Sequence, residues 1–179
     1  TAETLPLRNF QQYMDWISRL EKLDDVIDQY IALANQGIEN QIMPPKVLMS
    51  RVLNQIKLQN VDSYINSPFY DAFEVLPDEI SNQEQEQIRE QAQITITNVV
   101  IPSYVKLLNF FENSYYPNCR DTIGISDIKN GSQYYELIAR QFTTTELTPD
   151  EIHNIGLSEV TRIKNEMFKI MDQVQWNGS

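Results

Sequence analysis

The stretch "YYELIARQFTTTELTPDEIHNIGLSEVTRI", residues 134–163, contains the clearest helix start in the chain. Thr148 is followed by Pro149 at the first helical position and by Glu151 three residues after the threonine, which is the pattern of a capping box. Apolar residues then recur every three or four positions over 152–174, as they do on one face of a helix. The segment therefore predicts a long helix that begins after Thr148.

Helical spacing also recurs before this helix. We predict four further helices: a long one from Pro6 to a stop or bend near Gly37, one after Pro44–Pro45, one from Asn82 to about Tyr116, and a short one over Tyr134–Phe142. The run "ITITNVVI" (94–101) could also form a strand, but the helical spacing on both sides favours a helix. Pro102 predicts a kink or break just before it, because proline cannot donate the helical hydrogen bond.

Two segments interrupt this spacing, 62–80 and 117–133, and we predict irregular loops there. The first loop carries four aromatic residues: Tyr64, Phe69, Tyr70 and Phe73. These rings either fasten the loop onto the helices or line a ligand cleft, since aromatic side chains serve both purposes. The sequence as a whole predicts an all-α fold of about five or six helices, with residues 1–179 forming a single helical domain.

Acidic residues outnumber basic ones by 25 to 14, which gives a net charge of −11. Nucleic-acid phosphates and anionic membrane surfaces repel such a chain, so we expect no nucleic-acid partner. The acidic surface is either simply solvated or a binding face for cations or basic peptides. No uninterrupted run of about 18 apolar residues occurs, so no transmembrane segment is predicted.

The chain carries few of the residues that metal or triad catalysis requires. A catalytic zinc takes three protein ligands, usually including at least two His or Cys, and this chain has one of each, His153 and Cys119. We therefore expect no catalytic zinc site of the usual kind within the chain, and a histidine-dependent triad would have to use His153. His153 is either a helix-edge residue that hydrogen-bonds a neighbour or part of a site, because histidine titrates near neutral pH.

Four stretches resemble, in the same order, segments of the family named domain of unknown function 885, bacterial proteins related to zinc metallopeptidases. They are "MPPKVLMSRVLNQI" (43–56), "SPFYDAFEVLP" (67–77), "CRDTIGISDIKNGSQYY" (119–135) and the opening stretch. The resemblance covers nearly the whole chain. It implies an all-helical fold and a gluzincin-like zinc site, whose H-E-x-x-x-G-H-H-like motif and downstream glutamate would lie C-terminal to Ser179.

By this resemblance the chain would be the N-terminal part of a longer protein, cut before its metal ligands. It would supply one wall of a peptide-binding cleft, and the missing C-terminal half would be its partner. The substrate-proximal candidates are Tyr134, Tyr135, Arg140, Thr143, Thr144, Thr145 and His153. Tyrosine and arginine can hydrogen-bond a peptide backbone or a terminal carboxylate. Alternatively, these residues only set the angle between two helices. Gln141 and Phe142 stand where family members often have two histidines, so this chain lacks that pair.

The resemblance also implies a periplasmic or lipid-anchored location, because exported lipoproteins occur among family members. The rival hypothesis is a non-catalytic interaction or scaffold module. If the helices pack against a second half, part of the apolar stripe over 152–174 lacks a partner within 179 residues. Such exposed patches drive association, so we expect a homo-oligomer at high concentration.

Overall fold

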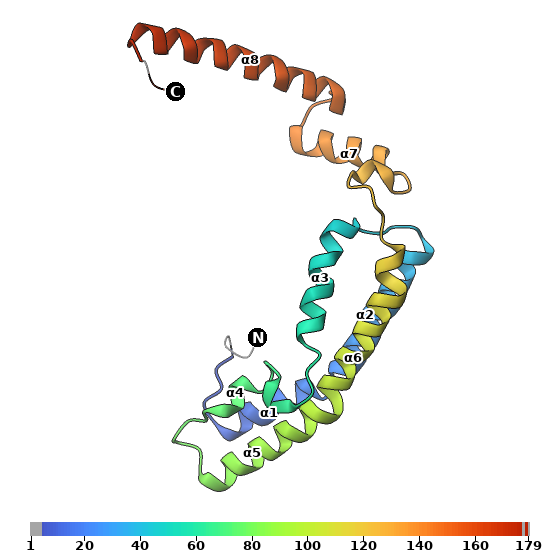
Figure 1. Cartoon of the computed structure of the whole chain (residues 1–179), viewed down its shortest axis with the longest axis vertical. Coiled ribbons are helices and arrows are strands. Elements are labelled where there is room, and N and C mark those ends of the chain that lie inside the picture. The colour runs from blue at the N-terminus through green and yellow to red at the C-terminus, as the bar shows by residue number, and fades with distance from the viewer. Residues whose placement is uncertain (1–4, 177, 179) are drawn as a thin grey trace. The chain divides into compact units, whose positions relative to one another are not determined.

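The computed structural model describes residues 5–176 and 178 (Figure 1). These residues form helices and no strand; one isolated bridge pairs Pro45 with Arg120. The all-α prediction is therefore confirmed. The chain divides into two compact units, Thr1–Ile123 and Gly124–Ser179, which we describe separately. The expectation of a single domain over 1–179 stays a prediction.

The α-helices described in unit 1 are α1 (Phe10–Leu20), α2 (Leu23–Glu39), α3 (Lys46–Leu58), α4 (Asp71–Glu74), α5 (Asn82–Thr95) and α6 (Ile101–Phe110). The prediction of one long first helix is wrong, because α1 and α2 are separated by a turn at Glu21 and Lys22. In that turn the Lys22 N–H bonds the Arg19 carbonyl, three residues back, at 3.1 Å. Since α1 packs on α5 and α2 on α6, the bend lets each half follow its own partner. No proline or glycine marks this turn in the sequence.

Helices α5 and α6 are continuous, so of the kink or break predicted before Pro102 the break does not occur, and the helix bends between α5 and α6 (Figure 1). Instead a π-helical turn, Ile96–Val100, precedes the proline, and the Ile101 N–H bonds the Ile96 carbonyl five residues back. The wider turn accommodates a residue that lacks an N–H and crowds the carbonyl four residues before it. The helix preferred for "ITITNVVI" is confirmed. With α5–α6 counted once and the four-residue α4 left out, the described residues form six helices, within the predicted number.

By length and composition alone, the continuous stretch Asn82–Asn118 could cross a membrane. A buried core helix passes the same test, and 28% of the apolar window is buried within the described residues. Ile88, Ala92 and Ile96 are fully buried within unit 1. Buried Ser103 on the same stretch donates a hydrogen bond to an Asp24 carboxylate oxygen at 2.9 Å. The expectation that the chain has no transmembrane segment stays a prediction.

The core of unit 1 gathers α1, α5 and the segment between α3 and α5. Its buried residues are Tyr13, Ile17, Leu20, Phe73, Leu76, Ile80, Ile88, Ala92, Ile96 and Val100. Most of 62–80 is irregular, as predicted, apart from α4 and a 3₁₀ turn at Tyr64–Asn66. Phe73 is fully buried and its ring centroid lies 5.9 Å from that of Tyr13 on α1, so this ring fastens the segment onto α1.

A polar cluster joins α2 to α6 at the rim of this core. The Lys106 ammonium lies 2.5 Å from Asp24 and 2.6 Å from Asp28. Hydrogen bonds from Lys106 and from the Ser103 hydroxyl lower the pKa of Asp24 below its usual range. The cluster therefore holds α2 against α6 most firmly when Asp24 is ionised.

Unit 2 contains a 3₁₀ turn (Ile125–Asp127), α7 (Gly131–Thr143) and α8 (Pro149–Gln173). Helix α7 begins three residues before the predicted Tyr134, because Asn130 takes a left-handed conformation, with φ of 58°, and starts the helix. A Cβ on Gly131 would lie 1.9 Å from the Ile125 carbonyl oxygen, so only glycine fits where α7 meets the 3₁₀ turn.

The predicted capping box of α8 is confirmed. The Glu151 N–H donates to the Thr148 hydroxyl at 3.2 Å, and the Thr148 N–H donates to the Glu151 carboxylate at 2.8 Å. The Thr148 hydroxyl also donates to the Glu151 carboxylate at 2.8 Å, and the bonds from the Thr148 N–H and hydroxyl lower the pKa of Glu151.

Candidate functional site

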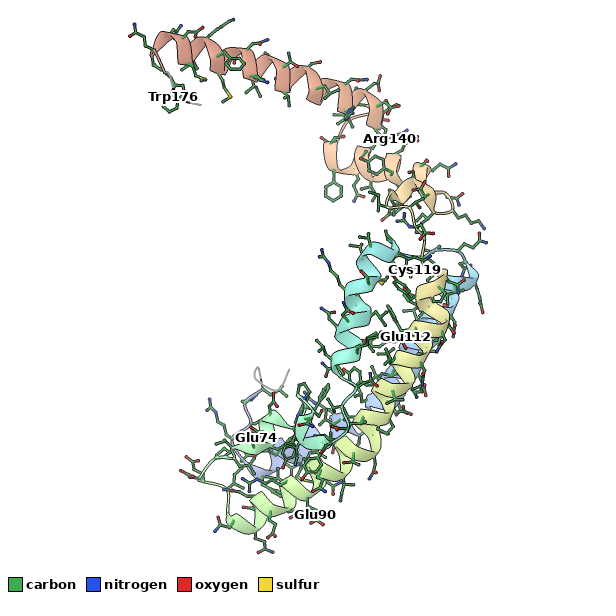
Figure 2. The ribbon with its side chains drawn as sticks, in the orientation of Figure 1. Glu74, Glu90, Glu112, Cys119, Arg140 and Trp176 are labelled. Atoms are coloured by element: carbon green, nitrogen blue, oxygen red, sulfur yellow. The ribbon has the colours of Figure 1, made fainter. Side chains whose placement is uncertain are left out.

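Three of the predicted site residues, Tyr134, Tyr135 and Arg140, lie on α7 with exposed side chains. The two tyrosines project about 100° apart around the helix because they are adjacent in sequence. Arg140 lies near the end of α7 (Figure 2), and its Nη1 is 3.7 Å from the Glu146 carboxylate. Both partners are exposed, so this ion pair is weak and leaves the guanidinium open to another carboxylate. The role of these residues in binding substrate stays a prediction.

The three threonines at the C-terminal end of α7 lead into the turn that connects it to α8: Thr143 is the last residue of α7, and Thr144 and Thr145 follow it. Thr143 Oγ1 donates to the Ala139 carbonyl at 2.8 Å and lies 2.9 Å from Thr145 Oγ1. Thr144 takes a left-handed conformation, with φ of 56°, and its N–H bonds the Arg140 carbonyl. The hydroxyls thus serve the local backbone, which agrees with the alternative that this segment sets the angle between two helices.

His153 lies exposed on α8, shortly after the capping box. Cys119 is buried, and burial raises the pKa of its thiol, so it is mostly the unreactive thiol at neutral pH. Within residues 5–176 and 178, no group of three His, Cys, Asp or Glu side chains is placed to hold a metal ion. These residues therefore do not fit a zinc site, and the expectation of ligands elsewhere stays a prediction.

A cleft of about 890 Å³ lies within unit 1, in the size range of small-molecule and peptide sites. Its walls come from the segment before α1, from α1, α3, α4 and α6, and from the loop before α4. The lining residues are Leu5, Leu7, Tyr13, Trp16, Val52, Gln55, Ile56, Gln59, Pro68, Phe69, Asp71, Ala72 and Tyr104. The Phe69 and Tyr104 rings contact each other with centroids 5.7 Å apart. Phe69 therefore both packs the loop against a helix and lines a cleft, the two roles considered for the loop aromatics.

One residue of the cleft lining carries a buried polar group without a partner. The indole Nε1 of Trp16 is buried and has no hydrogen-bond acceptor within the described residues. Leaving a buried donor unsatisfied costs on the order of 1–3 kcal/mol, so such groups usually have a partner. Burial raises the pKa of Tyr13 and of Tyr104, and both phenols therefore stay neutral at physiological pH.

The charges around the cleft are of one sign. Asp71 is an exposed carboxylate, and none of the described residues that line the cleft is basic. Gln55 on α3 and Gln59, the residue that caps its C-terminal end, lie one helical turn apart and add amide donors and acceptors. The cleft is thus lined by apolar and aromatic side chains, two amide groups and one negative charge.

The family model described as "Bacterial protein of unknown function (DUF885)" matches residues 1–179, the whole chain. The chain belongs to the DUF885 family. This match confirms the resemblance inferred from the sequence segments. A search of curated protein sequences found no match.

A solved structure of another protein has the same fold as this DUF885 chain. It is "the putative lipoprotein from Colwellia psychrerythraea", which aligns with 24% sequence identity and a TM-score of 0.76. The alignment covers 98% of this chain and 30% of that one. The DUF885 chain therefore spans about a third of the length of this structural neighbour.

Sequence reasoning about the DUF885 chain missed most of the cleft. Tyr13 and Trp16 are three residues apart and belong to the same apolar stripe as the core, so spacing alone assigns them to packing. Tyr104 lies in an apolar run and carried no signal of its own. The one available hint was the aromatic content of 62–80, where Phe69 was considered as a cleft residue.

Proposed function

We propose that this chain is the N-terminal helical part of a longer, zinc-metallopeptidase-like protein that acts on peptides. It contributes one wall of the substrate cleft and no metal ligands. Three observations support this proposal: the resemblance of 134–163, the family match over the whole chain, and a structural neighbour of which this chain covers 30%. The observation that carries it is the uncovered apolar face of unit 2.

That face, which we call the α8 face, is large for a water-soluble surface. Helix α8 is 25 residues long and has no buried residue. Six exposed apolar side chains follow one side of this helix and its C-terminal cap: Ile155, Val160, Ile163, Met167, Ile170 and Val174. Leu157 and Phe168 are also exposed but lie away from this stripe. A helix with such a stripe is stabilised by packing it against another element, and a face of this kind marks an interaction site. Further helices of a longer chain would supply that packing.

On α7, Tyr134, Tyr135 and Arg140 would hold the peptide. The phenols can hydrogen-bond a peptide backbone, and the Arg140 guanidinium can pair with a terminal carboxylate in place of the exposed Glu146. His153, on the first turns of α8, would lie on the same wall. The metal ligands would come from the additional chain. This wall therefore binds and orients the peptide, and the catalytic groups lie opposite.

A periplasmic or lipid-anchored location belongs to the same proposal. It is supported by the family resemblance and by the name of the structural neighbour, "putative lipoprotein". The net charge of −11 agrees with anchoring through a lipid rather than through contact with anionic headgroups, which would repel the chain.

A second candidate is a non-catalytic scaffold or interaction module of an exported lipoprotein. It is favoured by the threonine turn, whose hydroxyls already bond the local backbone, as at Thr143 and Ala139. In this case the α8 face binds another protein and Arg140 has no substrate.

The endogenous protein separates the two candidates. It would be isolated from the source cells with an antibody against this chain, and its mass, zinc content and activity on a mixed peptide library measured. We expect a mass well above the 20.9 kDa of this chain, one zinc per polypeptide and cleavage that a chelator abolishes. A larger protein without zinc or cleavage would favour the scaffold, and a 20.9 kDa protein would contradict the proposal.

A further inference from the structure

We propose that the cleft of unit 1 is a binding site for an extended peptide segment that carries a large apolar side chain beside a positively charged group. The site does not require zinc or the groups on α7, so it stands whether or not the proposed peptidase activity is found. Three properties of the lining, its shape, its hydrogen-bonding groups and its charge, lead to this ligand.

The shape and composition of the cleft suit one large side chain and the backbone around it. At about 890 Å³ the cavity lies near the upper end of the volumes of ligand sites. Phe69 and Tyr104 form one aromatic wall, and Val52 and Ile56 come from α3. Aromatic and branched aliphatic walls favour an apolar side chain, because burying it removes apolar surface from water.

The hydrogen-bonding groups match those of a peptide backbone. The amides of Gln55 and Gln59 can each donate and accept, as a peptide bond does. The Trp16 N–H is buried and not open to the cleft, so it is not one of these groups.

The charge of the lining decides between peptides and anionic amphiphiles. Asp71 attracts a cation, and the described lining residues supply no basic group to pair with a carboxylate or phosphate. A fatty acid or phospholipid headgroup would therefore meet one negative charge and no positive one. A neutral or basic peptide segment meets complementary groups at every point.

Trp16 allows the site to be observed directly, because Trp176 is the only other tryptophan in the sequence. In a Trp176→Phe background, the fluorescence emission and the single indole N–H resonance report on Trp16, a residue of the cleft lining. The probes are capped peptides of sequence Gly-Phe-Gly-Lys, Gly-Ala-Gly-Lys and Gly-Phe-Gly-Glu. We expect the Phe–Lys peptide to shift both signals saturably. The alanine peptide should bind at least about tenfold more weakly than the Phe–Lys peptide, since it buries far less apolar surface. The glutamate peptide should bind about two- to fivefold more weakly than the Phe–Lys peptide.

Charge reversal provides the matched control. Asp71→Arg, checked for folding by circular dichroism, should make the glutamate peptide the better ligand. Asp78→Arg, an equal charge change at an exposed residue outside the lining, should leave the order unchanged. Should Asp71→Arg not fold, Asp71→Asn should remove the preference for lysine over glutamate.

Three outcomes would overturn the proposal. The first is the absence of a saturable change at Trp16 with the Phe–Lys peptide. The second is identical behaviour of the two arginine variants. The third is a change at Trp16 with dodecyl maltoside, or with increasing protein concentration, that the peptides do not produce; this would assign the cleft to a lipid or to a second copy of the chain.

Discussion

Replacing Gly131 by alanine should destabilise unit 2 far more than the same change at Gly156. A Cβ at Gly131 would lie 1.9 Å from the Ile125 carbonyl oxygen, about 1.5 Å inside the 3.4 Å at which ordinary contact begins. The neighbouring atoms are backbone and cannot move aside as a flexible side chain would. Since overpacking typically costs about 1–3 kcal/mol, we expect a cost near 3 kcal/mol for Gly131→Ala.

Gly156→Ala is the matched control. A Cβ there meets nothing within 4 Å, and Gly156 lies in the interior of α8. Alanine should therefore stabilise α8 by about 1 kcal/mol through helix propensity alone. Urea unfolding measures the free energies, and hydrogen exchange over 125–143 localises the effect to the start of α7. If Gly131→Ala unfolded within about 0.5 kcal/mol of the wild type, the inferred contact with Ile125 would be refuted.

Three further predictions follow from the caps, the charges and the α8 face. Thr148→Ala removes the cap hydroxyl of α8 and should cost about 1 kcal/mol in chemical denaturation; an unchanged midpoint would mean that the helix starts elsewhere. The folded state holds the pKa of Asp24 below 3.8 and that of Glu151 below 4.5, so both contributions to stability are present above these values and are lost as the pH falls through the lower folded-state values. Thermal unfolding between pH 7 and pH 2 should therefore show decreasing stability below about pH 4.5, and a flat profile would contradict both interactions. Light scattering over a concentration series should show species heavier than 20.9 kDa, which Ile163→Lys should reduce. A strict monomer at every concentration would argue that the α8 face does not mediate self-association.

Most of the fold could be predicted from local sequence signals. The capping box at Thr148 is confirmed by reciprocal hydrogen bonds, because a cap depends only on residues three positions apart. The division of α1 from α2 could not be predicted, since its cause is the bend of the partner helix α5–α6. The form of the bend at Pro102, a π turn rather than a break, likewise depends on packing.

The candidate site residues, too, could be predicted only where the signal is local in sequence. The sequence identified the exposed residues of α7, among them Tyr134 and Arg140, because they belong to a recognisable family segment. It could not identify Trp16 and Tyr104, which come from helices far apart in sequence and meet only through tertiary folding. A buried indole with no acceptor is visible only once the surrounding side chains are placed.

The measurement that tests the central claim most directly is peptide cleavage by the endogenous, natural-length protein, with the isolated 179-residue chain assayed beside it. The proposed role predicts that the natural-length protein cleaves peptides, that a chelator stops it and that zinc restores it. It also predicts that the isolated chain is inert and shows no stoichiometric zinc binding by calorimetry. Chelator-sensitive cleavage by the isolated chain, or no cleavage by a zinc-loaded natural-length protein, would contradict the account.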